Sequence, residues 1–400
     1  MRDILILCFA YAISLFYRGM ISVVAPEISA DISVSEGGLG LLSSTFFISF
    51  AVAQVPSGLA LDRLGARLSI GLFMWLAVLG TMLFSIASSS SLAFVGQVFI
   101  GVGCAPIFTG TMLFIGCNYP TNRFTYYITL IIAVGSIGDL LGTTPLAILA
   151  EWLGWRSALL IVTVLSALTA SCCLLGLKPD RPDGINHSLK KMLQGMARIT
   201  TVRGLWPIIP MFLASYAVLM AIRGLWSGPY LAEVFQLGTD ERGNIILAMS
   251  IALGVGTFTL GVLDRLLKRT KQLVIVSSVL TLVPLCLLAI YPSEGPYFAM
   301  WAFVAIGLFG FNYPLLMSHS RSFLAPVYYG RGMAFLTALS FIGVALIQSV
   351  SGWMMGLAYE NQWFPSEQYR LLFLLLAGAL VLATLVYCFS DPQGNGSEPL

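Results

Sequence analysis

The chain has very little charge. Aspartate, glutamate, lysine and arginine make up 10% of its 400 residues, whereas a typical soluble domain has about 25%. Apolar residues reach 58%, and the mean hydropathy is +0.89. So few polar side chains cannot cover a water-exposed surface, which excludes a soluble globular protein and indicates that a lipid bilayer surrounds most of the chain.

The residues on which most enzymes depend are also scarce. The only two histidines, His187 and His319, are far apart, and the seven cysteines show neither metal-binding spacing nor the pattern of a disulfide framework. Neither a G-x-x-x-x-G-K loop nor a G-x-G-x-x-G fingerprint is present, so nothing indicates that nucleotide hydrolysis drives the protein. We therefore expect no enzymatic activity, no metal, no cofactor and no nucleic-acid partner.

Long apolar runs are abundant instead. Twelve of them approach the ~20 residues that one helix needs to cross a bilayer, and they form two groups of six separated by a polar segment. They lie near residues 4–25, 38–61, 69–87, 92–116, 125–150, 157–177, 204–230, 244–263, 272–291, 297–319, 332–357 and 370–389. The predicted fold is an all-α polytopic membrane protein with twelve transmembrane helices. Its two pseudo-symmetric six-helix halves span 1–177 and 204–389, with a cytoplasmic linker at 178–203 and a cytoplasmic tail at 390–400.

The basic residues predict which ends of the helices face the cytoplasm. Sixteen of the 21 lysines and arginines fall in the linker and the loops of one side, against three on the other side and two within apolar runs. Cytoplasmic loops carry the excess of lysine and arginine in membrane proteins. We therefore expect a multi-pass protein of the inner (plasma) membrane with both termini cytoplasmic.

The two halves repeat one another at an offset near 205 residues. The pattern Tyr-Ala-x5-Arg-Gly occurs at 11–19 and again at 216–224, and the pair Asp-Arg occurs at 62–63 and again at 264–265. Such a tandem repeat predicts two six-helix units that share one fold and one orientation in the membrane.

Each copy of the repeat places an arginine inside an apolar run. Arg18 lies near the middle of the first run and Arg223 near the middle of the seventh, although a central arginine costs about 2.5–3.5 kcal/mol on insertion scales. Helical spacing puts Arg18 on one stripe with Tyr11, Ser14 and Ser22, and Arg223 on one stripe with Tyr216, Trp226 and Tyr230. We predict that both guanidiniums face one aqueous cavity. The alternative is that each arginine is neutralised within the protein and only holds helices together.

Asp139 is the one carboxylate that we place at mid-depth in the membrane. Burial raises the pKa of such a group and a nearby arginine lowers it, so Asp139 is a candidate proton carrier or a fixed counter-ion. Asn312, Tyr313 and Gln348 are further candidates for contact with a solute, against the alternative of hydrogen bonds between helices. The candidate substrate-binding residues are Arg18, Arg223, Tyr11, Tyr216, Trp226, Tyr230, Asn312, Tyr313 and Gln348.

A short charged loop separates the second and third runs. Residues 58–67 have the order G-x-x-x-D-R-x-G-x-R, which closely resembles the loop between helices 2 and 3 of the major facilitator superfamily. The resemblance implies that superfamily's fold, with a solute site at the bilayer midplane between two parallel halves. It also implies a cytoplasmic gate at this loop, where Asp62 would approach Arg331. The expected gating residues are Gly58, Asp62, Arg63, Gly65, Arg67 and Arg331.

Within that superfamily, the first 70 residues resemble the branch of organophosphate:phosphate antiporters and anion:cation symporters. The resemblance rests on residues 11–26, 42–47 and 54–58, together with the Gly-Trp-Arg sequence at 154–156. In the phosphate-ester antiporters, paired arginines on the first and seventh helices bind the anionic group, and Arg18 and Arg223 occupy matching positions. The symporters commonly have acidic residues where this chain has Tyr17 and Cys104, so proton coupling depends on Asp139.

We therefore expect a secondary carrier of a small organic anion, either a phosphate ester or a carboxylate, that acts as a monomer. A coupling proton or a counter-substrate is a further expected partner. The alternative is uptake of a planar nutrient such as a vitamin, with Trp226, Tyr230, Phe311 and Tyr313 stacking on its rings. Drug efflux and a transporter-like sensor are the remaining alternatives, although a linker of about 25 residues offers a sensor little surface for a signalling partner.

Overall fold

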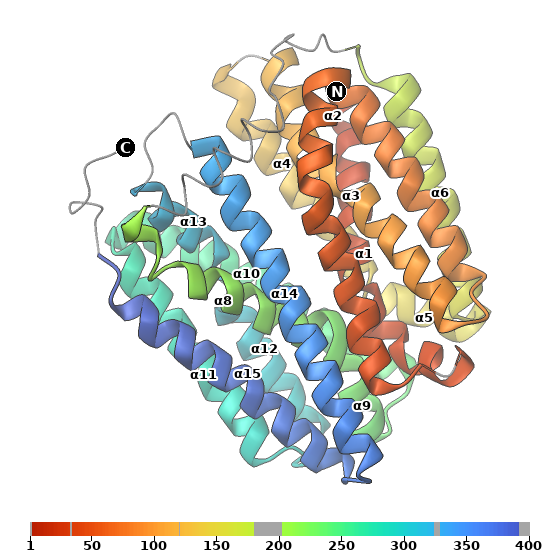
Figure 1. The fold of residues 1–400 in the computed structure, drawn as a ribbon, viewed down its shortest axis with the longest axis vertical. Helices are drawn as coiled ribbons and strands as arrows, with labels where there is room; N and C mark the ends of the chain where they lie inside the picture. Colours follow the sequence, from red (N-terminus) through yellow and green to blue (C-terminus); the bar gives the residue numbers. More distant parts are fainter. Residues whose placement is uncertain (1, 33, 120, 180–201, 324–328, 392–400) are drawn as a thin grey trace. The chain divides into compact units, whose positions relative to one another are not determined.

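The computed structural model describes residues 2–32, 34–119, 121–179, 202–323 and 329–391 (Figure 1). The described residues form helices and the turns between them. They group into two compact units, Met1–Leu189 with Thr239–Gly243, and Lys190–Gly238 with Asn244–Leu400. Most of the predicted linker, at 180–201, and most of the predicted tail, at 392–400, lie outside the described residues.

The first unit is a bundle in which α1 and α2 carry most of the packing. α1 packs against α4 and α6, while α2 packs against α3 and α6. The bounds are α1 (Arg2–Ile32), α2 (Glu36–Ser85), α3 (Ser90–Asn118), α4 (Thr121–Leu141), α5 (Thr144–Leu153) and α6 (Trp155–Gly176).

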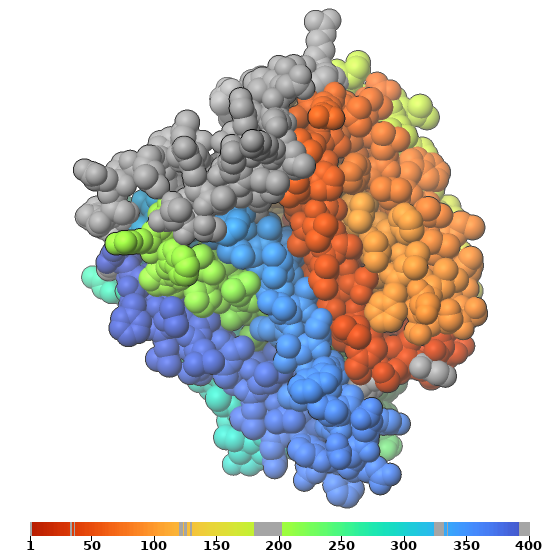
Figure 2. Space-filling model, in the orientation of Figure 1, coloured from red at the N-terminus to blue at the C-terminus, as the bar shows by residue number. Residues whose placement is uncertain are grey.

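The second unit is centred on α8 and α11. α8 packs against α14 and α15, and α11 packs against α12 and α15; the side chains of α14 form a continuous band along one face of this unit (Figure 2). A 3-10 turn (Arg203–Leu205) precedes α8 (Ile209–Ala221), a π-helical turn (Ile222–Trp226), α9 (Ser227–Phe235), α10 (Thr239–Leu267) and α11 (Thr270–Ile290). Then come α12 (Pro296–Gly310), α13 (Tyr313–Arg321), α14 (Tyr329–Glu360) and α15 (Pro365–Cys388).

The helices confirm the predicted all-α membrane fold. Eleven stretches of the described chain are long and apolar enough to cross a membrane, and one of them, Gly37–Ser85, has 49 residues. That stretch is two helices meeting at Gly65, whose φ of 79° and ψ of 173° are not helical. Each of the twelve predicted runs therefore has a helix, and the predicted tight turn falls at the glycine that can adopt a positive φ.

The apolar outer surface of both units fits a bilayer environment. Large apolar side chains such as Leu175 (82% exposed) and Phe258 (74% exposed) lie on the outside of α6 and α10. Monomeric soluble proteins rarely expose extensive apolar surface. These side chains would therefore contact lipid tails, as the composition predicts.

The same helix pair packs through a glycine in both units. A Cβ atom added to Gly138 of α4 would lie 2.1 Å from the backbone oxygen of Ala12 in α1, and one added to Gly343 of α14 would lie 2.0 Å from that of Leu213 in α8. Gly343 follows Gly138 by 205 positions, the offset of the sequence repeat. The internal repeat thus extends to how the first and fifth helices of each half approach one another.

Two ion pairs hold the ends of helices in the first unit. Arg156 pairs with Asp31 at the end of α1 and donates to the backbone oxygen of Ala87 at 2.7 Å. Arg242, in the part of α10 that belongs to this unit, pairs with Glu27 at 2.5 Å, and its side chain is 4% exposed. Both arginines fall on the predicted non-cytoplasmic side, but the sequence did not indicate their partners.

Candidate functional site

Arg18 lies in the middle of α1 against aromatic and polar neighbours. Its guanidinium carbon is 5.3 Å from the ring centre of Phe50 in α2, within the range of a cation–π interaction. Cys104 of α3 is buried beside it and hydrogen-bonds with Ser14. The thiol of Cys104 thus lies close to Arg18. In the symporters that the sequence resembles, the position of Cys104 is commonly a glutamate.

Tyr11 of α1 packs against the part of α4 that precedes Asp139. The ring of Tyr11 packs against Phe108 of α3 at 5.1 Å between centroids, and a Cβ on Gly135 would lie 2.3 Å from this ring. Asp139 follows Gly135 by one helical turn and is half-buried. The first unit therefore gathers an arginine, a tyrosine and the helix that carries the acidic candidate.

Arg223 lies in the π-helical turn of the second unit. The turn spans Ile222–Trp226, and single π-helical turns occur frequently at functional sites. The side chain of Arg223 is 2% exposed, and its Nε donates to the hydroxyl of Ser250 in α10 at 3.0 Å. Sequence analysis missed Ser250, for which the only signal was a polar residue within an apolar run.

Four aromatic rings, which we call the Tyr216 cluster, gather near the break between α12 and α13. Tyr216 of α8 lies 5.7 Å from Phe311, 6.0 Å from Tyr313 and 5.8 Å from Phe341 of α14, measured between ring centroids. Phe311 and Tyr313 are stacked at 6.0 Å with an interplanar angle of 18°. Of the four, only Phe341 was not anticipated from the sequence.

Trp226 and Tyr230 belong to a second aromatic group, separate from the Tyr216 cluster. Trp226 donates to the hydroxyl of Ser351 at 2.9 Å, and Tyr230 donates to the backbone oxygen of Pro292 at 2.6 Å. Both rings also pack against Tyr369. Tyr230 follows Tyr216 by about four helical turns, or roughly 21 Å along a helix, so the two groups lie at different levels of the seventh helix. The stripe predicted there stays a prediction.

Asn312 and Gln348 are both buried but differ in how their amides are used. Asn312 accepts from Ser215 at 2.5 Å and donates to Ser277 and Ser278 at 3.1 Å each. Gln348 donates to the backbone oxygen of Met220 at 3.2 Å, while its Oε1 has no hydrogen-bond partner among the described residues. Both amide atoms of Asn312 are thus hydrogen-bonded to serines, and only the Nε2 of Gln348 is bonded among the described residues. Contact of either residue with a solute stays a prediction.

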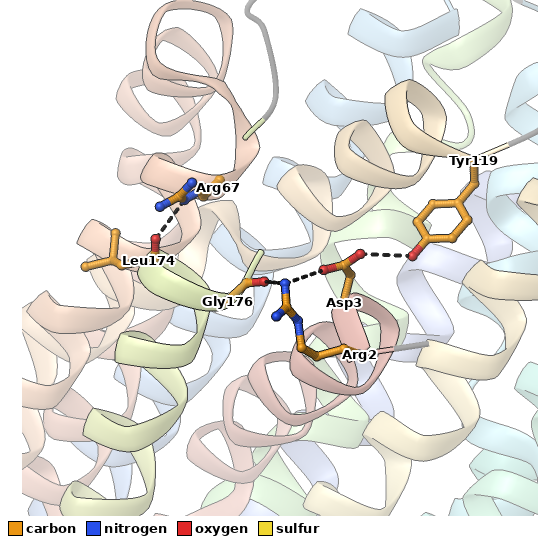
Figure 3. Close-up of polar contacts among 6 residues, drawn as sticks. All are labelled: Arg2, Asp3, Arg67, Tyr119, Leu174 and Gly176. Atoms are coloured by element: carbon orange, nitrogen blue, oxygen red, sulfur yellow. Dashed lines mark hydrogen bonds and ion pairs between the residues drawn. The ribbon is translucent and has the colours of Figure 1, made fainter. Parts of the chain in front are cut away.

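The predicted gating loop is tied to the end of α6. Arg67, just after the Gly65 break, donates from Nε to the backbone oxygen of Leu174 at 2.7 Å, and Arg2 donates to that of Gly176 at 2.5 Å (Figure 3). Gly58 and Asp62 are half-buried, whereas Arg63 is exposed. The side chain of Arg331 lies outside the described residues, so its predicted approach to Asp62 stays a prediction.

The same end of the first unit holds a polar contact between α1 and α3. The hydroxyl of Tyr119 donates to Oδ2 of Asp3 at 3.4 Å, and Asp3 lies 3.9 Å from Arg2 (Figure 3). Burial, and after it the nearby negative charge of Asp3, raise the pKa of the Tyr119 phenol. The phenol is therefore neutral at physiological pH and acts as a hydrogen-bond donor to the carboxylate.

The comparison with protein families agrees with this arrangement of helices. The sequence profile of the Major Facilitator Superfamily matches residues 7–319 and, in a second match, 224–399. These matches cover most of the chain, so the protein belongs to this superfamily. The resemblance inferred from the loop at 58–67 is thereby confirmed.

Individual relatives show where the likeness lies. The chain is 25% identical over 413 residues to a putative tartrate transporter of Agrobacterium vitis, covering 96% of this chain and 93% of the relative. It is 28% identical over 181 residues to a second protein of that name and organism, but this match covers only 40% of the relative. The crystal structure of a D-xylose-proton symporter superposes with a TM-score of 0.81 at 14% identity, covering 100% of this chain and 99% of that chain, a likeness of fold alone.

Fold, family and relatives together define the class of the protein. It is a secondary transporter of the major facilitator type, a multi-pass membrane carrier and not an enzyme. Small solutes are the substrates of such carriers. The expectation of a transporter rather than a catalyst is confirmed.

Proposed function

We propose that the protein carries a small organic anion, a carboxylate or a phosphate ester, and that Arg18 and Arg223 bind its anionic group. The observation that carries the proposal is the duplicated arginine. Each unit holds one guanidinium in a membrane helix, Arg18 beside the ring of Phe50 and Arg223 beside the hydroxyl of Ser250. Bidentate hydrogen bonds between arginine and a carboxylate or phosphate would offset the unfavourable free energy of placing this charge inside the membrane. The putative tartrate transporters, named for a dicarboxylate, support the same substrate class.

Conservative substitution of each arginine tests this proposal. Arg18→Lys and Arg223→Lys keep the charge but lose the planar fork, so each should weaken binding of the transported anion by roughly 1.5–3 kcal/mol, or about 10- to 150-fold in Kd. A thermal-shift screen of the purified protein against tartrate, hexuronates and glycerol 3-phosphate identifies the ligand. Titration calorimetry then measures its affinity in each variant.

The double variant and a control sharpen the test. Because both arginines are proposed to contact one group, the two losses should be strongly non-additive. Arg123→Lys, at an exposed arginine, should leave the affinity unchanged. An anion that binds both single variants as tightly as the native protein would contradict the proposed anion site.

A planar nutrient is the second candidate, favoured by the Tyr216 cluster. Its four rings are contributed by α8, α14 and the break between α12 and α13, and aromatic side chains stack on flat ligands. In that case the arginines would donate hydrogen bonds to ring carbonyls. Water-soluble vitamins in the same screen separate the candidates, since a ligand lost in only one arginine variant, whatever its own charge, favours the planar nutrient.

We further propose an inner-membrane location with both termini cytoplasmic, on the distribution of lysine and arginine. Coupling to a proton depends on Asp139, the half-buried acid of α4. Exchange for a counter-substrate is the alternative mode for a carrier of this type.

A further inference from the structure

The second unit holds a basic cavity that the proposed solute site does not use. It has a volume of about 560 Å³ and lies where the turn between α10 and α11 meets the end of α13. It is lined by Lys268, Arg269, Thr270, Lys271, Gln272, Ile275, Ser318, His319 and Ser322. The lining has three permanent cations and no carboxylate, so the cavity attracts an anion.

One wall of the cavity is built from residues that are already engaged. Lys271 donates to the backbone oxygens of Cys388 at 2.7 Å and Ser390 at 2.5 Å. Both ring nitrogens of His319 are also occupied, one by the hydroxyl of Tyr387 at 2.7 Å and the other by the backbone oxygen of Asp391 at 2.9 Å. These contacts fasten the end of α15 to α11 and α13, so the wall is ordered before a ligand arrives.

The opposite wall carries the cations that remain available. Lys268 has no ion pair or hydrogen bond from its side chain to the described residues, and Arg269 makes one long hydrogen bond, 3.4 Å, to Gln272. Asp264 accepts from Thr270 at 2.6 Å and Asp391 contacts His319 through its backbone oxygen, and neither carboxylate lines the cavity. The positive end of α11 adds to the potential of these two side chains.

Exposed apolar side chains lie next to the lining residues along the chain. Leu266 (72% exposed) and Leu267 end α10, and Val276 (52% exposed) lies on the second turn of α11. Both helices belong to the stretches able to span a membrane. A ligand with a phosphate at the level of the helix ends and hydrocarbon chains beside them would match both surfaces. Basic pockets at the cytoplasmic ends of transmembrane helices bind such headgroups.

We propose that this cavity binds the phosphate headgroup of an anionic phospholipid, with Lys268 and Arg269 as the residues that contact the phosphate. The acyl chains would lie along Leu266, Leu267 and Val276. Binding would stabilise the junction of α10, α11, α13 and α15. This site is independent of the solute bound at Arg18 and Arg223.

The test uses the purified full-length protein in detergent, titrated with phosphatidylglycerol or with zwitterionic phosphatidylcholine. Thermal unfolding and native mass spectrometry report binding. Phosphatidylglycerol should raise the unfolding midpoint more than phosphatidylcholine. In Lys268→Gln/Arg269→Gln the apparent Kd for phosphatidylglycerol should rise about 30-fold. Each basic residue near an anionic lipid contributes roughly a factor of five, and two such residues are removed.

Three controls decide the outcome. Arg123→Gln/Arg265→Gln removes the same charge from exposed positions outside the cavity and should change the Kd less than twofold, while Lys268→Arg/Arg269→Lys keeps the charge and should retain binding. Glycerol 3-phosphate has the headgroup chemistry without acyl chains, so any stabilisation that it gives should be the same in the native protein and in Lys268→Gln/Arg269→Gln. Equal lipid binding by all variants would overturn the site. Stabilisation by glycerol 3-phosphate that is lost in Lys268→Gln/Arg269→Gln would overturn the lipid in favour of a soluble phosphate ligand.

Discussion

Buried polar side chains of similar type have different roles here. Asn312 makes three hydrogen bonds to serines of α8 and α11, whereas Gln348 uses only its Nε2 among the described residues. A buried polar atom without a partner costs free energy, and a functional contact can compensate for that cost. The hydrogen bonds therefore distinguish Asn312 from Gln348, although the sequence made both candidates for contact with the substrate.

Replacement of Asn312 tests its structural role. Asn312→Ala would leave the hydroxyls of Ser215, Ser277 and Ser278 without this partner, and should destabilise the protein by about 1–3 kcal/mol with little change in ligand affinity. Thermal unfolding and calorimetry measure the two effects. Asn361→Ala, at an exposed asparagine, is the control. A large loss of affinity with unchanged stability would instead make Asn312 a ligand contact.

Two pairs of helices approach each other closely at glycines, which have no side chain to keep the backbones apart. Gly138 and Gly343 bring α4 onto α1 and α14 onto α8, at positions related by the repeat. A second feature of the helices is the π-helical turn at Arg223. It lies between Tyr216, which belongs to one aromatic cluster, and Tyr230, which belongs to another.

Substitution of Gly343 tests the close approach of α14 to α8. The added methyl group of Gly343→Ala would meet the backbone oxygen of Leu213 at 2.0 Å, so we expect a loss of about 1–3 kcal/mol from overpacking. Gly378→Ala places a methyl group in open space on α15 and should be neutral or stabilising, because alanine favours helix. Unfolding midpoints in detergent compare the two variants. Equal midpoints would show that the helices relax apart.

The whole molecule must alternate between two states to transport a solute. The segment 58–67, which contains the break at Gly65, contacts α6 through Arg67, and the family resemblance predicts that it forms part of the cytoplasmic gate. A gate changes the rate of interconversion more than the affinity of either state for the solute.

Asp62→Asn should therefore slow transport at least tenfold while changing ligand affinity less than threefold, values equivalent to about 1.4 and 0.65 kcal/mol. Uptake into proteoliposomes and binding to the purified protein give the two numbers. Glu360→Gln, at an exposed acid, should leave both unchanged. Parallel losses of transport and binding would place Asp62 outside the gate.

Proton coupling is a second property of the whole transport cycle. If Asp139 carries the coupling proton, Asp139→Asn should abolish accumulation driven by a pH gradient but spare exchange of labelled for unlabelled solute, because exchange does not require the proton to be released. Both are measured in proteoliposomes. Accumulation by the native protein that ignores an imposed pH gradient would leave Asp139 with the role of a structural counter-ion.

By itself the sequence determined the membrane class, the position of each spanning helix, the glycine turn at Gly65 and the superfamily. Hydropathy, charge and turn chemistry act over short stretches of chain, so they can be read without knowing what a helix packs against. The tertiary structure decided which ring neighbours each aromatic side chain of the seventh helix has and which buried amide is satisfied. It also revealed Ser250 beside Arg223 and the basic cavity at the α10–α11 turn. These features depend on partners far apart in the chain, such as Tyr216 and Phe341. Their pairing follows from the packing of whole helices.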